Sequence, residues 1–201
     1  VKLARGEKMN VNEVSRALKE KKYMTRQELL NLGVTDSILS RWVQMGKINR
    51  VSRGIYSYEE DVIDIMFLLQ QKYKRAIFSH ESALYLHDLS DRIPETHVMT
   101  VYRNYNVRKN DMTPVVFRYV DEKIHGLGVM EMDTMFGNRV LAYNVERTIC
   151  DIIRSETKME KYTVNFALRE YAKVAKFSKL MIYAKQMGLE QIVMRKMEVL
   201  L

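Results

Sequence analysis

The sequence predicts an α+β protein, in which three helices and a basic hairpin precede a mixed α/β body with a helical tail. Three patterns support this prediction. Helix-start and helix-stop residues alternate up to residue 46, apolar residues repeat with a period of two between residues 97 and 143, and helical periodicity returns after residue 144. We expect the first domain to span residues 9–57 and the second to span residues 58–201, with the helical tail over 157–201.

Capping signals define the first helices. Asn12 is expected to cap a helix that runs through Lys22. Thr25 followed by Glu28 forms a capping box, and Gly33 is suited to end the helix that begins there. Thr35 is expected to cap the next helix, which runs to about Met45 and is closed by Gly46.

The helix after Thr35 divides into two faces at helical spacing. Its apolar residues are expected to pack inward: Ile38, Leu39, Trp42, Val43 and Met45. Its polar residues recur at i, i+3, i+4 and i+7 and form one stripe: Ser37, Ser40, Arg41 and Gln44. Ser, Arg and Gln side chains can bond to base edges in the major groove of DNA. An ordinary solvated helix face is the alternative interpretation.

A basic hairpin follows this helix. The runs 47–51 and 55–57 are expected to be short strands joined through Ser52-Arg53-Gly54, where Gly supplies a positive φ. Lys47, Arg50 and Arg53 are expected to contact the phosphate backbone, with Arg53 able to enter the minor groove. Cations that deter aggregation of an edge strand are the alternative. Together the segments predict a winged helix-turn-helix that binds DNA, with Arg26 and Thr35 added to the contact residues.

The rest of the chain contains both helical and strand patterns. A helix is expected from Glu59 to Tyr73, and Ser79 is expected to cap a short helix over residues 80–89. Period-two runs predict strands, with residues 104–114 and 121–126 as connections. The predicted strands are 97–103, 115–120, 127–132 and 140–143. The predicted later helices are 146–155, 164–175, 178–187 and 189–201.

Charge is distributed unevenly along the chain, whose formal net charge is +8. Residues 1–57 hold 12 Lys and Arg against 5 Asp and Glu, residues 58–156 hold 12 against 16, and residues 157–201 hold 9 against 4. The net charges are therefore +7, −4 and +5, and they favour a polyanionic partner at the front of the chain. No apolar run approaches the length of a membrane span. Residues 1–8 are expected to be a tag remnant or an extension before Met9.

Signals for an enzyme are weak. The single cysteine, Cys150, lies among isoleucines and is expected to be buried rather than nucleophilic. His80 and His87 would share a helix face, with His97 near in sequence. We expect structural roles for them, because further ligands at metal-binding spacing are not evident.

Two further patterns have a structural and a catalytic interpretation. Arg147 and Asp151 are expected to form an intrahelical pair, with a site in the second domain as the alternative. Glu156-Thr157-Lys158 has the E-x-K form of some nucleases but lacks a preceding strand with an acidic partner. The segment 126–128 is too short for a phosphate loop. We expect no enzyme, no cofactor and no bound metal.

Three segments resemble the AbiEi-type antitoxins of type IV toxin-antitoxin systems, which act in abortive phage infection. They are RWVQMGKINRVSRGIYS (41–57), FSHESALYLHDLSDRIPETHVMTV (78–101) and NVERTICDIIR (144–154). The resemblance implies a winged helix that represses its own operon by binding inverted repeats. It also implies a C-terminal domain that counters a nucleotidyltransferase-like toxin without a stable complex. Basic residues of the tail would share in DNA contact; the candidates are Lys173, Lys176 and Lys179.

We therefore expect a cytoplasmic transcriptional autorepressor and antitoxin whose partner is double-stranded DNA. Three alternatives remain open at this point. The chain could instead be another winged-helix regulator. The winged domain could instead dock to a protein, which predicts no salt-dependent affinity for DNA. Residues 60–201 could instead hold a nuclease or nucleotidyltransferase, which an assay with a divalent metal would reveal.

Overall fold

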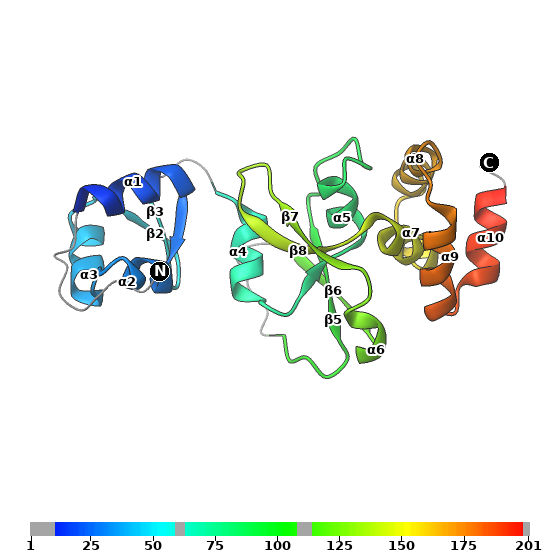
Figure 1. The fold of residues 1–201 in the computed structure, drawn as a ribbon, viewed down its shortest axis with the longest axis horizontal. Helices are drawn as coiled ribbons and strands as arrows, with labels where there is room; N and C mark the ends of the chain where they lie inside the picture. Colours follow the sequence, from blue (N-terminus) through cyan, green and yellow to red (C-terminus); the bar gives the residue numbers. More distant parts are fainter. Residues whose placement is uncertain (1–10, 59–62, 108–113, 199–201) are drawn as a thin grey trace. The chain divides into compact units, whose positions relative to one another are not determined.

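The computed structural model describes residues 11–58, 63–107 and 114–198. It contains helices together with two separate sheets, so the predicted α+β class is confirmed at that level. The chain divides into two compact units, Val1–Leu68 and Leu69–Leu201 (Figure 1).

The N-terminal unit combines three helices with a small antiparallel sheet. The helices are α1 (Val11–Lys21), α2 (Arg26–Asn31) and α3 (Asp36–Gln44), and the strands are β1 (Tyr23–Thr25), β2 (Asn49–Ser52) and β3 (Ile55–Ser57). Both outer strands pair antiparallel with β3, which gives the order β1-β3-β2. The sequence patterns predict the β2–β3 hairpin but not β1. Residues 23 to 25 form a strand because they pair with residues on β3, a contact between distant parts of the sequence.

Side-chain caps fix the starts of α2 and α3. The Thr25 hydroxyl accepts the Glu28 N–H at 3.3 Å, and the Glu28 carboxylate accepts the Thr25 N–H at 2.7 Å, so the predicted capping box is present. The Thr35 hydroxyl accepts the Ile38 N–H at 3.4 Å. Each cap satisfies a backbone donor that the first helical turn leaves unpaired. At α1 the prediction differs, because Asn12 lies inside the helix rather than at its cap.

The apolar faces of α1, α2 and α3 form the core of this unit together with residues of β1, β3 and the connecting segments. The buried residues are Val14, Leu18, Met24, Leu29, Val34, Leu39, Trp42, Ile48 and Tyr56. Burying a large apolar side chain contributes roughly 1.5–3 kcal/mol, so this cluster holds the three helices together. Met45 does not join it and is 56% exposed. The prediction that Met45 packs inward was wrong because Met45 is the C-cap residue, where the chain leaves α3.

Helix α4 (Ile65–Lys72) begins later than the predicted start at Glu59; residues 59–62 lie outside the described residues. The Asp64 carboxylate accepts the Phe67 N–H at 3.0 Å, and the Asp64 N–H donates to the Tyr23 hydroxyl at 2.9 Å. The Phe67 and Tyr23 rings lie 5.9 Å apart. These contacts attach the start of α4 to the N-terminal unit, which therefore extends to Leu68 rather than ending at residue 57.

The C-terminal unit is built on a mixed five-stranded sheet in the order β6-β5-β4-β8-β7. The strands are β4 (Ile77–Phe78), β5 (His97–Tyr102), β6 (Val115–Val120), β7 (Val129–Asp133) and β8 (Arg139–Tyr143). Strand β5 runs parallel to β6, and β4 runs parallel to β8, while the other pairs are antiparallel. The period-two patterns predict four of these strands. They do not predict β4, which is two residues long.

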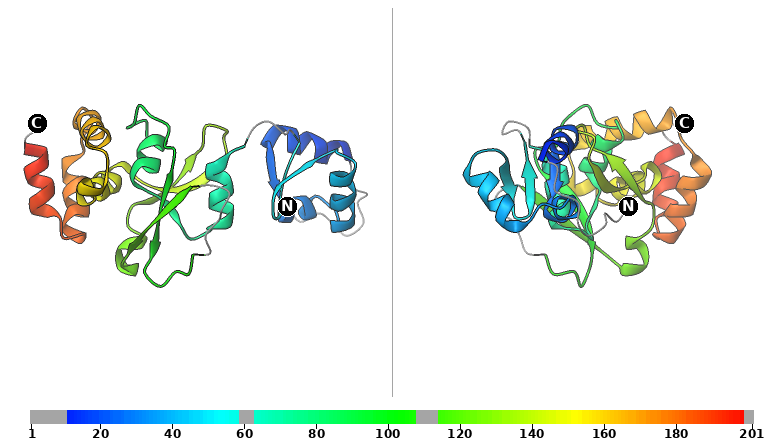
Figure 2. Two further views of the ribbon diagram at one scale, coloured as in Figure 1. Left: turned by 180° about the vertical axis from the view of Figure 1, so that it is seen from behind. Right: turned by 60° about the vertical axis from the view of Figure 1, so that its left-hand side comes forward.

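Helices accompany this sheet. They are α5 (His80–Leu86), α6 (Glu122–His125), α7 (Val145–Arg154), the 3₁₀ turn η1 (Glu156–Lys158), α8 (Lys161–Ala172), α9 (Phe177–Gln186) and α10 (Glu190–Glu198). Helices α7 to α10 lie together on one side of the sheet (Figures 1 and 2). Their shared core includes Leu84, Ile149, Tyr171, Leu180 and Val193. The segment 121–126, predicted as a connection, contains α6, which the Asp121 side chain caps.

Ser79 precedes α5 but, contrary to the prediction, its side chain does not cap the helix. Its hydroxyl instead accepts a hydrogen bond from Thr100 on β5 at 2.8 Å and lies 3.0 Å from Nδ1 of His80. The Ser79 hydroxyl is thus engaged by Thr100 of the neighbouring strand and by the His80 ring, and it does not cap α5. Among the described residues, no helix is long and apolar enough to cross a membrane.

Candidate nucleic-acid interface

Helix α3 presents the predicted polar stripe to solvent. Ser37, Ser40, Arg41 and Gln44 are all exposed, while Leu39 and Trp42 on the opposite side are 1% and 8% exposed. The buried side anchors the helix, so the stripe faces outward whatever its own side chains do. At the start of the helix the Thr35 and Ser37 hydroxyls lie 2.9 Å apart. Thr35 is exposed, but its hydroxyl oxygen already serves as the helix cap.

The hairpin that follows is buried on one strand and cationic at its exposed positions. Residues Ile55, Tyr56 and Ser57 of β3 are buried. Arg50 on β2 and Arg53 in the turn are exposed, and so is Lys47, which precedes the strand instead of lying in it. Gly54 completes the turn at φ 80°, in the left-handed region that a β-carbon disfavours. The burial of β3 therefore holds the cations at the surface of the unit.

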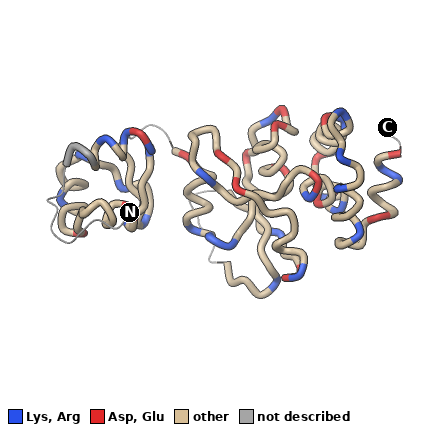
Figure 3. Tube along the Cα trace, viewed as in Figure 1, with Lys and Arg blue, Asp and Glu red and all other residues tan. Residues whose placement is uncertain are grey.

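Some Lys and Arg side chains of this unit form ion pairs with carboxylates, and others do not. Arg41, Lys47, Arg50 and Arg53 make no ion pair with another described residue, whereas Arg16 pairs with Glu20 and Lys21 pairs with Glu28. Lys and Arg outnumber Asp and Glu in this unit (Figure 3). Arg41, Lys47, Arg50 and Arg53 are available to a polyanion, because no ion pair with a described residue has to break before they bind it.

Arg26 differs from those four residues. Its Nε and Nη2 donate to the two carboxylate oxygens of Asp36 at 2.7 and 2.6 Å. This pair lowers the pKa of Asp36 and raises the pKa of Arg26. The Arg26 backbone N–H also donates to the carbonyl of Gly54 at 2.7 Å. One residue at the start of α2 therefore contacts both the start of α3 and the turn of the hairpin.

The predicted secondary contacts of the tail are partly occupied by other partners. Lys179 lies 2.8 Å from the carboxylate of Glu146, which is buried, and Lys173 lies 2.6 Å from Glu170. The charge of Lys179 offsets that of a buried carboxylate. Lys176 is exposed and makes no ion pair within the described part of the chain.

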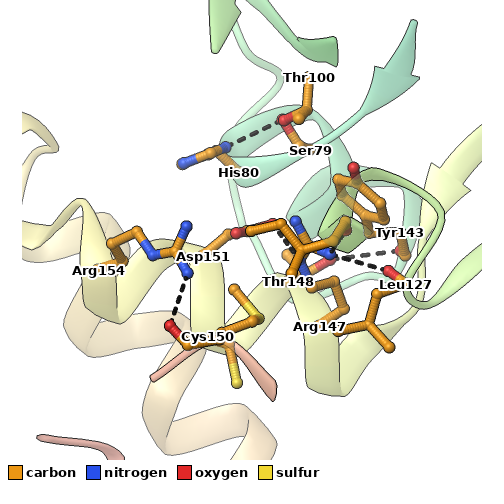
Figure 4. A network of polar contacts seen from close by, with 12 residues as sticks. Ser79, His80, Thr100, Leu127, Tyr143, Arg147, Thr148, Cys150, Asp151 and Arg154 are labelled. Atoms are coloured by element: carbon orange, nitrogen blue, oxygen red, sulfur yellow. Dashed lines mark hydrogen bonds and ion pairs between the residues drawn. The ribbon is translucent and has the colours of Figure 1, made fainter. Parts of the chain in front are cut away.

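A network of polar contacts surrounds α7 in the C-terminal unit (Figure 4). The Arg147 side chain donates from Nε to Asp151 at 3.0 Å and from Nη1 to the carbonyls of Ile124 and Leu127. Its guanidinium carbon lies 4.1 Å from the ring centre of Tyr143. The predicted intrahelical pair is therefore present and buried. Arg147 also connects α6 and the turn that follows it to α7 through hydrogen bonds. Burial raises the pKa of Asp151, and Arg147 opposes that rise.

His80 lies in the same region with a positive φ of 50°. Its ring nitrogens are 3.0 Å from the hydroxyls of Ser79 and Ser155. Burial, reinforced by Arg118, Arg147 and Arg154, lowers its pKa to about 3. His80 is therefore a neutral, hydrogen-bonded structural residue at neutral pH. His87 has separate contacts, because its Nε2 lies 2.7 Å from the carbonyl of Tyr143.

The remaining enzyme signals also have structural contacts. Cys150 is fully buried, and burial raises the pKa of its thiol to about 12, well away from the range of a nucleophilic cysteine. Glu156 of the E-x-K segment pairs with Lys196. The described residues bring together no group of three or more His, Cys, Asp or Glu that could hold a metal ion.

Comparison with known proteins identifies a likeness of fold. A crystal structure of the Rv2827c protein from Mycobacterium tuberculosis is similar to this chain, with a TM-score of 0.59. The match covers 87% of this chain and 70% of that one, at 11% sequence identity. An identity this low relates the two folds and no more. No protein-family model and no curated sequence matches the chain.

Proposed function

We propose that the N-terminal unit is a winged helix-turn-helix that binds double-stranded DNA, with α3 in the major groove and the β2–β3 hairpin as the wing. The observation that carries this proposal is the exposed polar stripe of α3, which includes Arg41, in the same small unit as three further cations, Lys47, Arg50 and Arg53. No described residue forms an ion pair with any of these four cations. Arg26 contacts both Asp36 and Gly54, so the start of α3 and the turn of the hairpin lie within reach of one residue.

Some of these side chains would contribute affinity for DNA, and others would contribute sequence preference. Lys47, Arg50 and Arg53 would release counterions from phosphates, which gives affinity that falls with salt but carries no sequence information. Arg41 has the planar fork that bonds both acceptors of guanine, and Gln44 can bond adenine in the same way. The α3 stripe would therefore recognise the DNA sequence, and the hairpin would contact the DNA phosphates.

We further propose that the whole chain is a cytoplasmic, non-enzymatic autorepressor and an antitoxin of the AbiEi type. This part rests on the resemblance of the three segments and on the DNA-binding proposal. It implies inverted repeats in the chain's own promoter and a nucleotidyltransferase-like toxin that is countered without a stable complex.

Competition binding tests the DNA proposal. The probe is a fluorescein-labelled duplex that carries the DNA immediately upstream of this chain's reading frame, and the competitor is a scrambled duplex of equal length and base composition. We expect the chain to prefer its own promoter and Arg53→Ala to weaken binding to both duplexes. Arg16→Ala is the matched control, because it removes an exposed cation of the same unit that lies on α1. Absence of binding at low salt would contradict the proposal and favour a protein-docking module.

Coexpression tests the antitoxin proposal. The neighbouring reading frame is expected to encode a nucleotidyltransferase-like protein that arrests growth, and this chain is expected to relieve the arrest. A deletion of residues 1–68 should abolish repression of a promoter fusion. A toxin that remains fully active in the presence of the full chain would contradict the antitoxin role while leaving the DNA proposal intact.

A further inference from the structure

Arg26 and Asp36 form a bidentate ion pair between the first residue of α2 and the first residue of α3. The two N···O distances are 2.7 and 2.6 Å, and the side chains are 48% and 61% exposed. Two parallel N–H···O bonds fix direction as well as distance, because both groups are planar. The pair therefore sets the position of the α3 start relative to α2 more strictly than a single contact could.

The same residue reaches the hairpin through its backbone. The Arg26 N–H donates to the Gly54 carbonyl at 2.7 Å, and Gly54 follows Arg53 at the tip of the turn. A β-carbon on Gly54 would lie 3.9 Å from the Arg26 β-carbon, so the two segments are already in close approach. Arg26 thus joins the two parts of the surface to which we assign base reading and phosphate contact.

We infer that Arg26 is a positioning residue, which aligns α3 with the hairpin through Asp36 and Gly54, and that it is not itself a phosphate contact. This inference rests on the proposed function and changes one residue of the predicted contact set. The Asp36 carboxylate occupies two of the five N–H groups of the guanidinium and neutralises its charge locally. A phosphate would have to compete with a carboxylate that is already bound in the best geometry.

The two roles make opposite predictions for the conservative variant Arg26→Lys. A lysine keeps the positive charge but lacks the planar fork. If Arg26 only positions, Arg26→Lys should weaken promoter binding as much as Arg26→Ala, and neither should change the dependence of log Kobs on log salt. If Arg26 contacts phosphate, Arg26→Lys should resemble the wild type, and Arg26→Ala should make the salt slope shallower by about 0.9.

The measured quantity is the ratio of affinities for the promoter duplex and the scrambled duplex, taken by fluorescence anisotropy over a salt series. We expect Arg26→Ala, Arg26→Lys and Asp36→Asn each to lower this ratio by about two- to five-fold, the range that exposed ion pairs contribute. The double variant Arg26→Ala/Asp36→Asn should lower it no further than the worse single variant, because both remove one interaction. Arg16→Lys and Glu20→Gln form the matched control, since they alter an exposed pair of α1.

A second measurement does not need DNA. Hydrogen exchange of the backbone amides of Arg26, Ile38 and Leu39, which donate to Gly54 and to Thr35, should be faster in Arg26→Ala and in Asp36→Asn than in the wild type, and unchanged in Glu20→Gln. Faster exchange in Arg26→Ala and Asp36→Asn, with no DNA binding by the wild type or by any variant, would contradict the proposed function and uphold the alignment role of Arg26. Unchanged exchange, or a shallower salt slope for Arg26→Ala, would overturn the positioning role.

Discussion

Arg147 and Asp151 form an ion pair that is closed to solvent: Nε of Arg147 lies 3.0 Å from Oδ2 of Asp151, and the two side chains are 0% and 3% exposed. The pair lies where α6, β8 and α7 of the C-terminal unit meet. Its guanidinium also holds two backbone carbonyls, those of Ile124 and Leu127. Such a pair is costly to desolvate, but it is more costly to break by removing one partner.

Replacing Arg147 by Met should lower the free energy of unfolding of the C-terminal unit by about 3–5 kcal/mol, because the Asp151 carboxylate then stays buried without its countercharge. Urea unfolding followed by far-UV circular dichroism measures this decrease. The fluorescence of Trp42, the single tryptophan, follows the N-terminal unit and should change little. The exposed pair on α1 is the control, and Glu20→Gln should cost less than about 1 kcal/mol. A decrease for Arg147→Met as small as that of the control would contradict this account.

His80 should make the stability of the chain depend on pH. Its pKa is lowered from 6.5 to about 3 in the folded chain, so the unfolded chain binds more protons between these values. Its contribution to the free energy of unfolding is complete above pH 6.5 and falls as the pH drops, by about 1.4 kcal/mol per pH unit, or about 2 kcal/mol at pH 5.

The variant His80→Asn tests this dependence, because asparagine tolerates the positive φ of this position and does not titrate. We expect its unfolding free energy to change less than that of the wild type between pH 7 and pH 5. The contributions of His87 and His125, whose pKa values burial also lowers, are common to both proteins and cancel. Parallel stability curves for the two proteins would rule out His80 as the titrating group.

Two glycines with nearly equal φ separate the cost of backbone strain from the cost of crowding. Gly128 has φ 79° and Gly137 has φ 78°, but a β-carbon on Gly128 would lie 2.8 Å from the β-carbon of Arg147, while one on Gly137 meets nothing within 4 Å. Gly137→Ala should cost about 1 kcal/mol from strain alone. Gly128→Ala should cost about 1–3 kcal/mol more, because the turn must move away from α7. Equal chemical-denaturation midpoints for the two variants would contradict the close approach.

The features that the sequence predicts correctly depend on neighbours along the chain. The capping box of Thr25 and Glu28 joins residues three apart, and the burial of Leu39 with the exposure of Ser40 follows from helical spacing. The same local reasoning fails at Met45, because a residue at a helix end no longer follows the helical period. Strand β6 has the predicted bounds, Val115–Val120, because its six residues are enough to show a β pattern.

The features that the sequence does not predict depend on partners far away along the chain. Strand β4 consists of Ile77 and Phe78, which are too few for a period, and it exists because β5 and β8 pair with it. In the candidate interface, the exposure of the stripe and of the hairpin cations is predictable. The pairing of Arg26 with Asp36, ten residues away between two helices, follows no local spacing. The neutralisation of Arg26 is therefore not predictable from the sequence.

Arg41 and Lys47 should differ in how their replacement affects binding to DNA. Arg41→Ala should weaken binding to the promoter duplex by about 1–3 kcal/mol and to the scrambled duplex by much less, because it removes a base contact. Lys47→Ala should weaken binding to both duplexes by the same factor, because phosphates are alike in the two. Titrations by fluorescence anisotropy at one fixed salt concentration provide both numbers. Equal effects on the two duplexes for Arg41→Ala would remove its assigned role.

The salt dependence of binding to the promoter duplex tests the central claim most directly. We expect log Kobs of the wild type to fall linearly with log salt. The slope of the triple variant Lys47→Ala/Arg50→Ala/Arg53→Ala should be shallower by about one unit for each phosphate that the hairpin no longer neutralises. A slope equal to that of the wild type, or a wild-type affinity that does not change with salt, would show that the hairpin cations do not hold DNA.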